Sequence, residues 1–110
     1  MDIYFKSKKI EKQLSSEREI DRHFGRNARL VKRRLQQFLA ADNLADFSKL
    51  PATGFHLLSG NRNRQMAVYL EHPFRITFEP FATEIPLKEN NEIELTAIKA
   101  ITIIDIEDYH

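Results

Sequence analysis

The spacing of hydrophobic residues changes near the middle of the chain. Up to residue 50 they recur every three or four positions, and from residue 55 they gather in short runs rich in β-branched and aromatic side chains. The first pattern is typical of amphipathic helices and the second of β-strands. We therefore expect a mainly helical first half, a sheet in the second half, and a further short strand over residues 2–5.

Local signals set the limits of the helices. Ser16 and Glu19 have the spacing of a capping box, so a helix begins near Ser16 after a first helical segment, and Gly25 is the kind of residue that ends one. Another helix is expected over residues 26–41. Its buried face is an apolar stripe with helical spacing, formed by Ala28, Val31, Leu35 and Phe38.

The second half reads as an antiparallel meander. One more helical turn over residues 43–50 is followed by β-prone runs at residues 55–58, 65–70 and 74–78, which are separated by turn residues. The polar, proline-containing segment 80–91 predicts an excursion from the sheet. Residues 98–106 are apolar on both faces, which is typical of a central strand.

Size and composition narrow the class of protein. A chain of 110 residues is the size of a single domain, and it contains no cysteine. There is no apolar run long enough to cross a membrane and no signal-peptide pattern at the start, so we expect a cytoplasmic protein. Motifs for catalytic metals, phosphate-binding loops and dinucleotides are missing, so we expect neither a metal nor a cofactor.

Charge is divided between the two halves. Residues 1–50 contain 12 Lys and Arg against 7 Asp and Glu, and residues 51–110 contain 5 against 9. The densest basic stretch, residues 26–34, contains no acid and suits a polyanion such as RNA. A solvated helix face explains the same stretch equally simply. The candidate RNA-binding residues here are Arg26, Arg29, Lys32 and Arg33.

Three groups of residues could carry chemistry. His56 is of the residue type that most often gives or takes a proton in catalysis, and Arg62, Arg64 and Arg75 can neutralise phosphate charge. The third group is Asp108, Tyr109 and His110, which directly follow the last predicted strand. Together they fit RNA cleavage by the neighbouring 2′-hydroxyl, which needs an acid, a base and cations but no metal. Each residue also has a plain structural interpretation, as a core histidine, solvated arginines or a frayed terminus.

Three segments in this order resemble the HigB-type toxins of the RelE/ParE superfamily. They are residues 55–65 (FHLLSGNRNRQ), residues 74–78 (FRITF) and the closing residues 108–110 (DYH). The resemblance implies an α+β fold in which N-terminal helices pack on a small, curved, mainly antiparallel sheet. It also implies ribosome-dependent cleavage of mRNA. The implied partner is a helix-turn-helix antitoxin of the HigA type, and the chain would bind operator DNA only through this antitoxin.

The resemblance implies a catalytic site at the positions that match the family's motifs. It does not say which of His56, Asp108 and His110 acts as the acid and which as the base. The members of this site are His56, Arg75, Asp108, Tyr109 and His110. The sequence departs from the family at Ser59, where a lysine is common, so one expected cation is missing. Two other functions stay open: a ParE-like inhibitor of DNA gyrase, which needs no acid and base, and an inactive module that only binds its partner.

Overall fold

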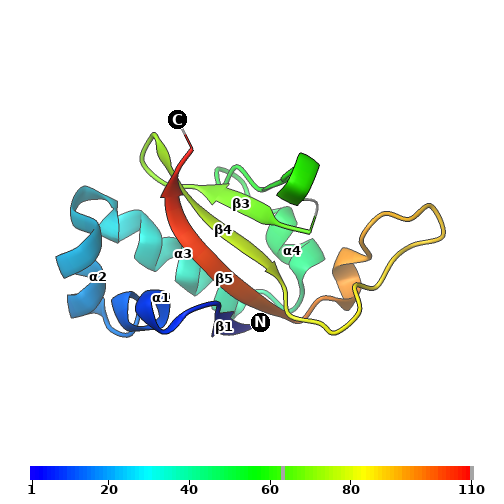
Figure 1. Cartoon of the computed structure of the whole chain (residues 1–110), viewed down its shortest axis with the longest axis horizontal. Coiled ribbons are helices and arrows are strands. Elements are labelled where there is room, and N and C mark those ends of the chain that lie inside the picture. The colour runs from blue at the N-terminus through cyan, green and yellow to red at the C-terminus, as the bar shows by residue number, and fades with distance from the viewer. Residues whose placement is uncertain (63, 110) are drawn as a thin grey trace.

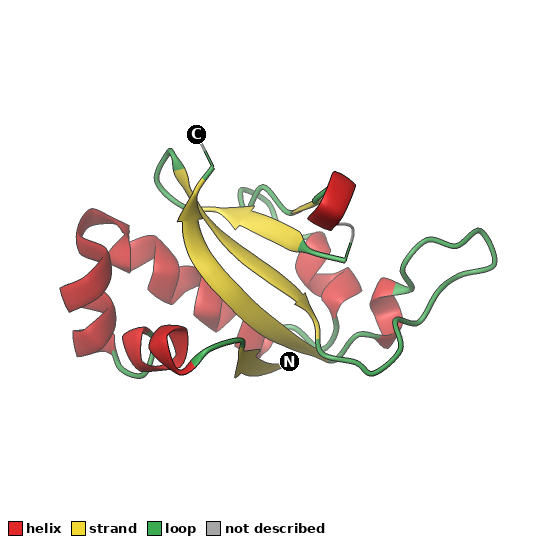
Figure 2. Cartoon of the chain, in the orientation of Figure 1, coloured by secondary structure: helices red, strands yellow, loops and turns green. Residues whose placement is uncertain are grey.

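The computed structural model describes residues 1–62 and 64–109, and it has the predicted order of a helical half followed by a sheet (Figures 1 and 2). The helices are α1 (Lys8–Gln13), α2 (Glu17–Phe24), α3 (Ala28–Ala40) and α4 (Leu44–Ser48). The strands are β1 (Asp2–Phe5), β2 (His56–Leu57), β3 (Met66–Tyr69), β4 (Phe74–Pro80) and β5 (Ala100–Asp108). Single 3₁₀ turns lie at Gly25–Asn27, Gly60–Arg62 and Leu95–Ala97.

The five strands form one sheet in the order β1-β5-β4-β3-β2. Strands β2 to β5 pair antiparallel, which confirms the predicted meander, and β1 is added parallel to β5 at the edge. Strand β5 is paired on both sides, as predicted from its sequence. The fold is therefore an α+β arrangement with a mainly antiparallel sheet.

The prediction that β5 is apolar on both faces was wrong, and a register shift explains why. Thr77 of β4 pairs with Asp105 of β5, but the next residue, Phe78, pairs with Ile103. Ile104 is thus an extra residue in β5, and such a bulge resets the alternation of side chains between the two faces. The consecutive isoleucines mark a bulge in the strand, and the face away from the helices carries polar residues.

The helix ends follow the predicted local chemistry. Ser16 precedes α2, and its hydroxyl oxygen accepts a hydrogen bond of 3.1 Å from the backbone N–H of Glu19. Ser7 caps α1 in the same way, accepting from the N–H of Ile10 at 3.2 Å. Gly25 follows α2 with a positive φ of 50°. These contacts satisfy backbone groups that a helix leaves without partners at its ends.

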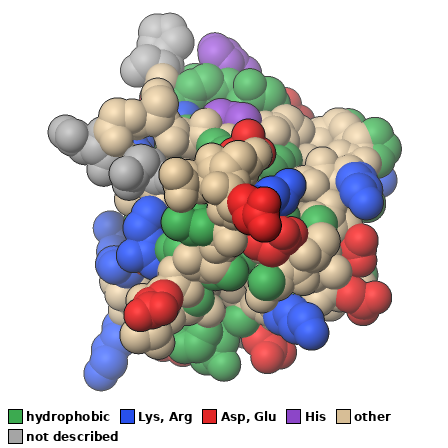
Figure 3. Space-filling view, turned by 90° about the vertical axis from the view of Figure 1, so that its right-hand side faces the viewer, with side chains coloured by type: hydrophobic (Ala, Val, Ile, Leu, Met, Phe, Trp, Pro, Cys, Tyr) green, Lys and Arg blue, Asp and Glu red, His purple; other side chains and the backbone are tan. Residues whose placement is uncertain are grey.

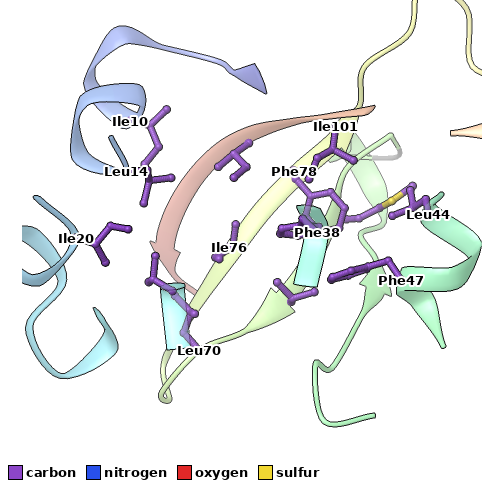
Figure 4. Packing of buried hydrophobic residues seen from close by; sticks show 14 of the residues in the cluster. Ile10, Leu14, Ile20, Phe38, Leu44, Phe47, Leu70, Ile76, Phe78 and Ile101 are labelled. Carbon is purple, nitrogen blue, oxygen red and sulfur yellow. The ribbon is translucent and has the colours of Figure 1, made fainter. Parts of the chain in front are cut away.

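Helices α1 to α4 pack on one face of the sheet and form one core with it (Figure 4). At its centre Phe38 of α3 stacks on Phe47 of α4, with ring centroids 4.3 Å apart, and meets Phe78 of β4 edge-on at 4.9 Å. The predicted stripe on α3 needs one correction. Leu35 is only partly buried, whereas the neighbouring Arg34 is buried.

The other face of the sheet, here called the outer face, points away from the helices (Figure 1). Alternation along the strands assigns Tyr69 of β3, Arg75 of β4 and Glu107 of β5 to it, since these three residues lie side by side in the pairing register. Between β4 and β5 the chain makes the predicted excursion, which projects from the body and is closed by a bridge between Leu87 and Ile93 (Figure 1).

Candidate active site on the outer face

The sheet brings three of the sequence-predicted site residues to one end of its outer face. Arg75 of β4 lies between Tyr69 of β3 and Glu107 of β5 in the register. His56 of β2 pairs with Ala67, two residues before Tyr69 and on the same face. Tyr109 follows Glu107 by two residues at the end of β5. Residues from four strands or their ends thus share one surface.

Tyr109 lies at the centre of this group. Its ring stacks on Tyr69 with centroids 6.0 Å apart, and the Arg75 guanidinium carbon lies 5.2 Å from the centre of the same ring. The backbone N–H of Tyr109 donates to the Pro73 carbonyl at 3.0 Å, which ties the chain after β5 to the turn between β3 and β4. His72 of this turn meets the Tyr109 ring edge-on at 5.9 Å. Both tyrosines remain exposed, so their rings can receive a further flat group.

The geometry of His56 sets which ring nitrogen can act as a base. Its Nδ1 lies 2.7 Å from the carbonyl oxygen of Gly54. A carbonyl only accepts hydrogen bonds, so we assign the proton to Nδ1, which leaves Nε2 as the basic nitrogen of the neutral ring. The ring itself lies 5.5 Å from that of Tyr69. Gly54 has a positive φ of 67°, and a side chain at this position would overlap the Tyr69 ring.

A carboxylate that the sequence analysis missed joins two of the arginines. Glu107 Oε1 accepts from Arg62 at 2.6 Å and lies 3.8 Å from Arg75 Nε. Arg62 is held further by donating from Nε to Gln65 at 2.8 Å. The Arg75 side chain is only 14% exposed, and among the described residues its buried Nε has no hydrogen-bond partner. Arg75 is therefore placed mainly by packing, and within residues 1–62 and 64–109 its carboxylate neighbour is Glu107, at 3.8 Å from Nε.

The last strand separates Asp108 from the group around Tyr109. Asp108 pairs in register with Phe74, whereas Glu107 pairs with Arg75, so Asp108 belongs to the opposite face of the strand from Arg75. His110 lies outside the described residues. Of the two closing residues that the structure describes, Tyr109 shares the outer face with His56 and Arg75, and Asp108 does not.

The basic stretch of α3 lies on the helix side of the sheet, away from this site. Arg29 and Arg33 are exposed there, as predicted, but Lys32 pairs with Asp21 at 2.7 Å and with Glu17 at 3.9 Å. The stretch is free of acids in the sequence, yet α2 supplies two of them. Arg26 is the exception in position, because its guanidinium donates to the His72 carbonyl at 3.2 Å, at the rim of the site.

Tyr69 and Glu107 could have been found from the sequence by counting along the strands. The short turn between β3 and β4 places Tyr69 opposite Arg75, and Glu107 shares a face with Tyr109 because it precedes it by two residues. His72 had no comparable signal. Among residues 1–62 and 64–109, His, Asp and Glu side chains form no group of three that could hold a metal ion.

None of the helices that the structure describes is both long and apolar enough to span a membrane. Comparison with known proteins adds no identification: neither a protein-family model nor a curated protein matches the chain.

Proposed function

We propose that the chain is a toxin of the RelE/HigB type, with the corresponding fold, that cleaves mRNA on the ribosome without a metal. The observation that carries this proposal is the position of Arg75, whose guanidinium lies over the Tyr109 ring on the outer face. The Tyr109 ring stacks on Tyr69, and the Tyr69 ring in turn lies 5.5 Å from that of His56. These side chains offer a cation, stacking surfaces and a base within one group. The antitoxin partner of the HigA type, and operator binding through it, belong to the same proposal.

The residues divide the reaction between them. Nε2 of His56 takes the proton of a 2′-hydroxyl, whose oxygen then attacks the adjacent phosphorus. The bond from phosphorus to the 5′-oxygen breaks, leaving a 2′,3′-cyclic phosphate and a 5′-hydroxyl. Tyr109 supplies the proton to the departing oxygen from its hydroxyl, which lies 3.4 Å from His72 Nδ1. Its exposed ring, with that of Tyr69, stacks the bases at the cut.

Arg75 stabilises the charge that builds on the phosphoryl oxygens. Its side chain is only 14% exposed, and this low exposure strengthens its interaction with an anion. Among the described residues, the carboxylate with which an RNA phosphate competes for Arg75 is that of Glu107, at 3.8 Å. Arg62 adds a second cation on the other side of the same carboxylate. RNA binding thus exchanges an internal carboxylate for a phosphate.

The test is cleavage of mRNA in a purified translation reaction. We expect Arg75→Ala to slow cleavage by roughly 100-fold or more, the scale of losing one preorganised donor. Arg22→Ala is the matched control, because Arg22 is exposed on α2 and, in the part of the chain that the structure describes, pairs with Glu19 at 3.8 Å. A 2′-deoxy nucleotide at the cut site should block the reaction and EDTA should not. Cleavage by Arg75→Ala at the wild-type rate would refute the assignment.

The second candidate function is an inactive module that only binds its partner. The carboxylate of Glu107 beside the two arginines favours it. Glu107 partly neutralises Arg62 and Arg75 in the free chain, and Asp108 lies on the other face of β5. For such a module, expression in a bacterium should leave growth and mRNA 5′ ends unchanged. The toxin proposal instead requires growth arrest with translation-dependent cuts, both removed by Arg75→Ala.

A further inference from the structure

A hollow lies on the outer face, and the proposed reaction does not use it. It has a volume of about 860 Å³ and lies between β1, the far ends of β4 and β5, and the start of the excursion. Its walls include the aromatic rings of Tyr4 and Phe81 and the charged groups of Lys6, Arg64 and Glu79. Its volume falls within the range of ligand sites.

The pairing register shows that the hollow continues the face of the active site. Tyr4 of β1 pairs with Thr102 of β5, which pairs with Glu79 of β4, so all three share a face. Glu79 follows Arg75 by four residues along one strand and therefore lies on the same face as Arg75, about 13 Å away at the ~3.3 Å rise of a strand. A single RNA strand lying along β4 would reach from one to the other.

Tyr4 and Phe81 form a stacking surface at this point. Their rings are stacked with centroids 4.0 Å apart and an angle of 23°, yet both remain largely exposed, at 43% and 54%. The backbone N–H of Phe81 donates to the Ala100 carbonyl at 2.9 Å, which fixes the start of the excursion beside β5. A fixed, exposed ring pair of this kind is what proteins offer to unpaired bases.

The charges around the ring pair fit a nucleotide. Lys6 and Arg64 outnumber Glu79, and the Lys6 side chain is 62% exposed, so its 3.7 Å contact with Glu79 leaves it accessible to phosphate. The Glu79 carboxylate can accept from base amino groups. Figure 3 views the molecule from the end that carries the excursion; Lys and Arg side chains lie on the left, the side of the outer face, and others lie on the right beside Asp and Glu.

From these observations we propose that the hollow is a second nucleotide subsite for single-stranded RNA. A base stacks on the Tyr4–Phe81 pair while Lys6 and Arg64 contact the neighbouring phosphates. The subsite rests on the proposed function, since it extends the RNA path beyond the cut. It predicts that RNA long enough to span both sites binds more tightly than RNA that fills the active site alone.

The test measures fluorescence anisotropy of labelled 2′-O-methyl oligouridylates, which cannot be cut. Phe81→Ala should raise the Kd of a decauridylate about tenfold, the scale of losing one stacked base, and leave that of a triuridylate unchanged. Phe81→Trp should restore binding. Leu87→Ala is the control, because Leu87 is equally exposed at 54% in the same excursion and does not line the hollow. Arg64→Gln should lower the slope of binding against salt by about one.

The outcomes separate the subsite from the proposed function. Decauridylate binding that is indifferent to Phe81 and Arg64, or absent in the wild-type protein, overturns the subsite, while Arg75-dependent cleavage would still support the nuclease. Binding that depends on Phe81, without Arg75-dependent cleavage, would retain the subsite and reject the nuclease. An equal loss for the decauridylate and the triuridylate also overturns the subsite, because it would show a general effect on the protein.

Discussion

Replacement of Arg34 by methionine tests how the helical layer holds the active-site strand. Arg34 is 5% exposed, and its guanidinium donates to the carbonyl oxygen of Tyr69 at 2.9 Å, that of Ala52 at 3.2 Å, and the Gln37 side chain at 3.2 Å. Ala52 has a left-handed φ of 67°, which costs free energy in a residue other than glycine. One side chain therefore joins α3 to the strained loop before β2 and to the end of β3.

The expected loss follows from the groups left behind. Methionine keeps the apolar stem but leaves the Tyr69 and Ala52 carbonyls without their donor, at about 1–3 kcal/mol each. Removal of the charge offsets part of this loss, because a buried charge is itself unfavourable. Burial, and to a lesser extent the neighbouring Arg33, lower the pKa of Arg34 for this reason. We expect Arg34→Met to reduce the free energy of unfolding by about 3 kcal/mol. Arginine stays protonated across the neutral range, so the loss should not vary with pH there.

Urea unfolding measures this difference directly. With a slope of ~1.5 kcal/mol per molar urea, a loss of about 3 kcal/mol lowers the midpoint by about 2 M. Arg33→Met is the matched control, because it removes the adjacent, exposed arginine, and its midpoint should stay close to that of the wild type. Equal midpoints for the two variants would refute the idea that Arg34 holds the loop and the strand.

Two further changes probe the site itself. Gly54→Ala should destabilise the protein by at least ~1 kcal/mol more than Gly60→Ala in the same urea assay. Both glycines have a positive φ, but only at Gly54 would the new side chain overlap the Tyr69 ring. Equal losses would mean that the Tyr69 ring simply moves aside. Glu107→Gln should tighten binding of a 2′-O-methyl oligouridylate by up to about fivefold, or ~1 kcal/mol, because it frees Arg75 from a carboxylate. Weaker binding in an anisotropy titration would show instead that Glu107 positions the arginines.

Much of the local structure could be predicted from the sequence because its causes lie a few residues apart. Ser16 and Glu19 meet within one helical turn, and Gly25 ends α2 through its own backbone conformation. The meander follows from short β-prone runs and the turns between them. His56, Arg75 and Tyr109 could be named as candidates from residue type and order, and the structure brings these three to one end of the sheet.

Only the tertiary structure decided which charged residues are free to act. Arg33 and Arg34 are adjacent and chemically identical, but one is exposed and the other is buried against carbonyls 18 and 35 residues away. Lys32 is paired because α2 packs beside α3. Whether a charge is neutralised depends on groups brought close by packing, and such long-range partners leave no periodic trace in the sequence.

The pairing of the last strand also had to come from the tertiary structure. Glu107, rather than Asp108, faces Arg75 because the strand register places it there, and one extra residue at Ile104 resets the alternation upstream. The amino-acid sequence by itself determined the elements and the inventory of reactive side chains, through interactions within a few residues. The tertiary structure alone decided which of them share the outer face, because that depends on register and bulge, which are fixed by packing across the whole sheet.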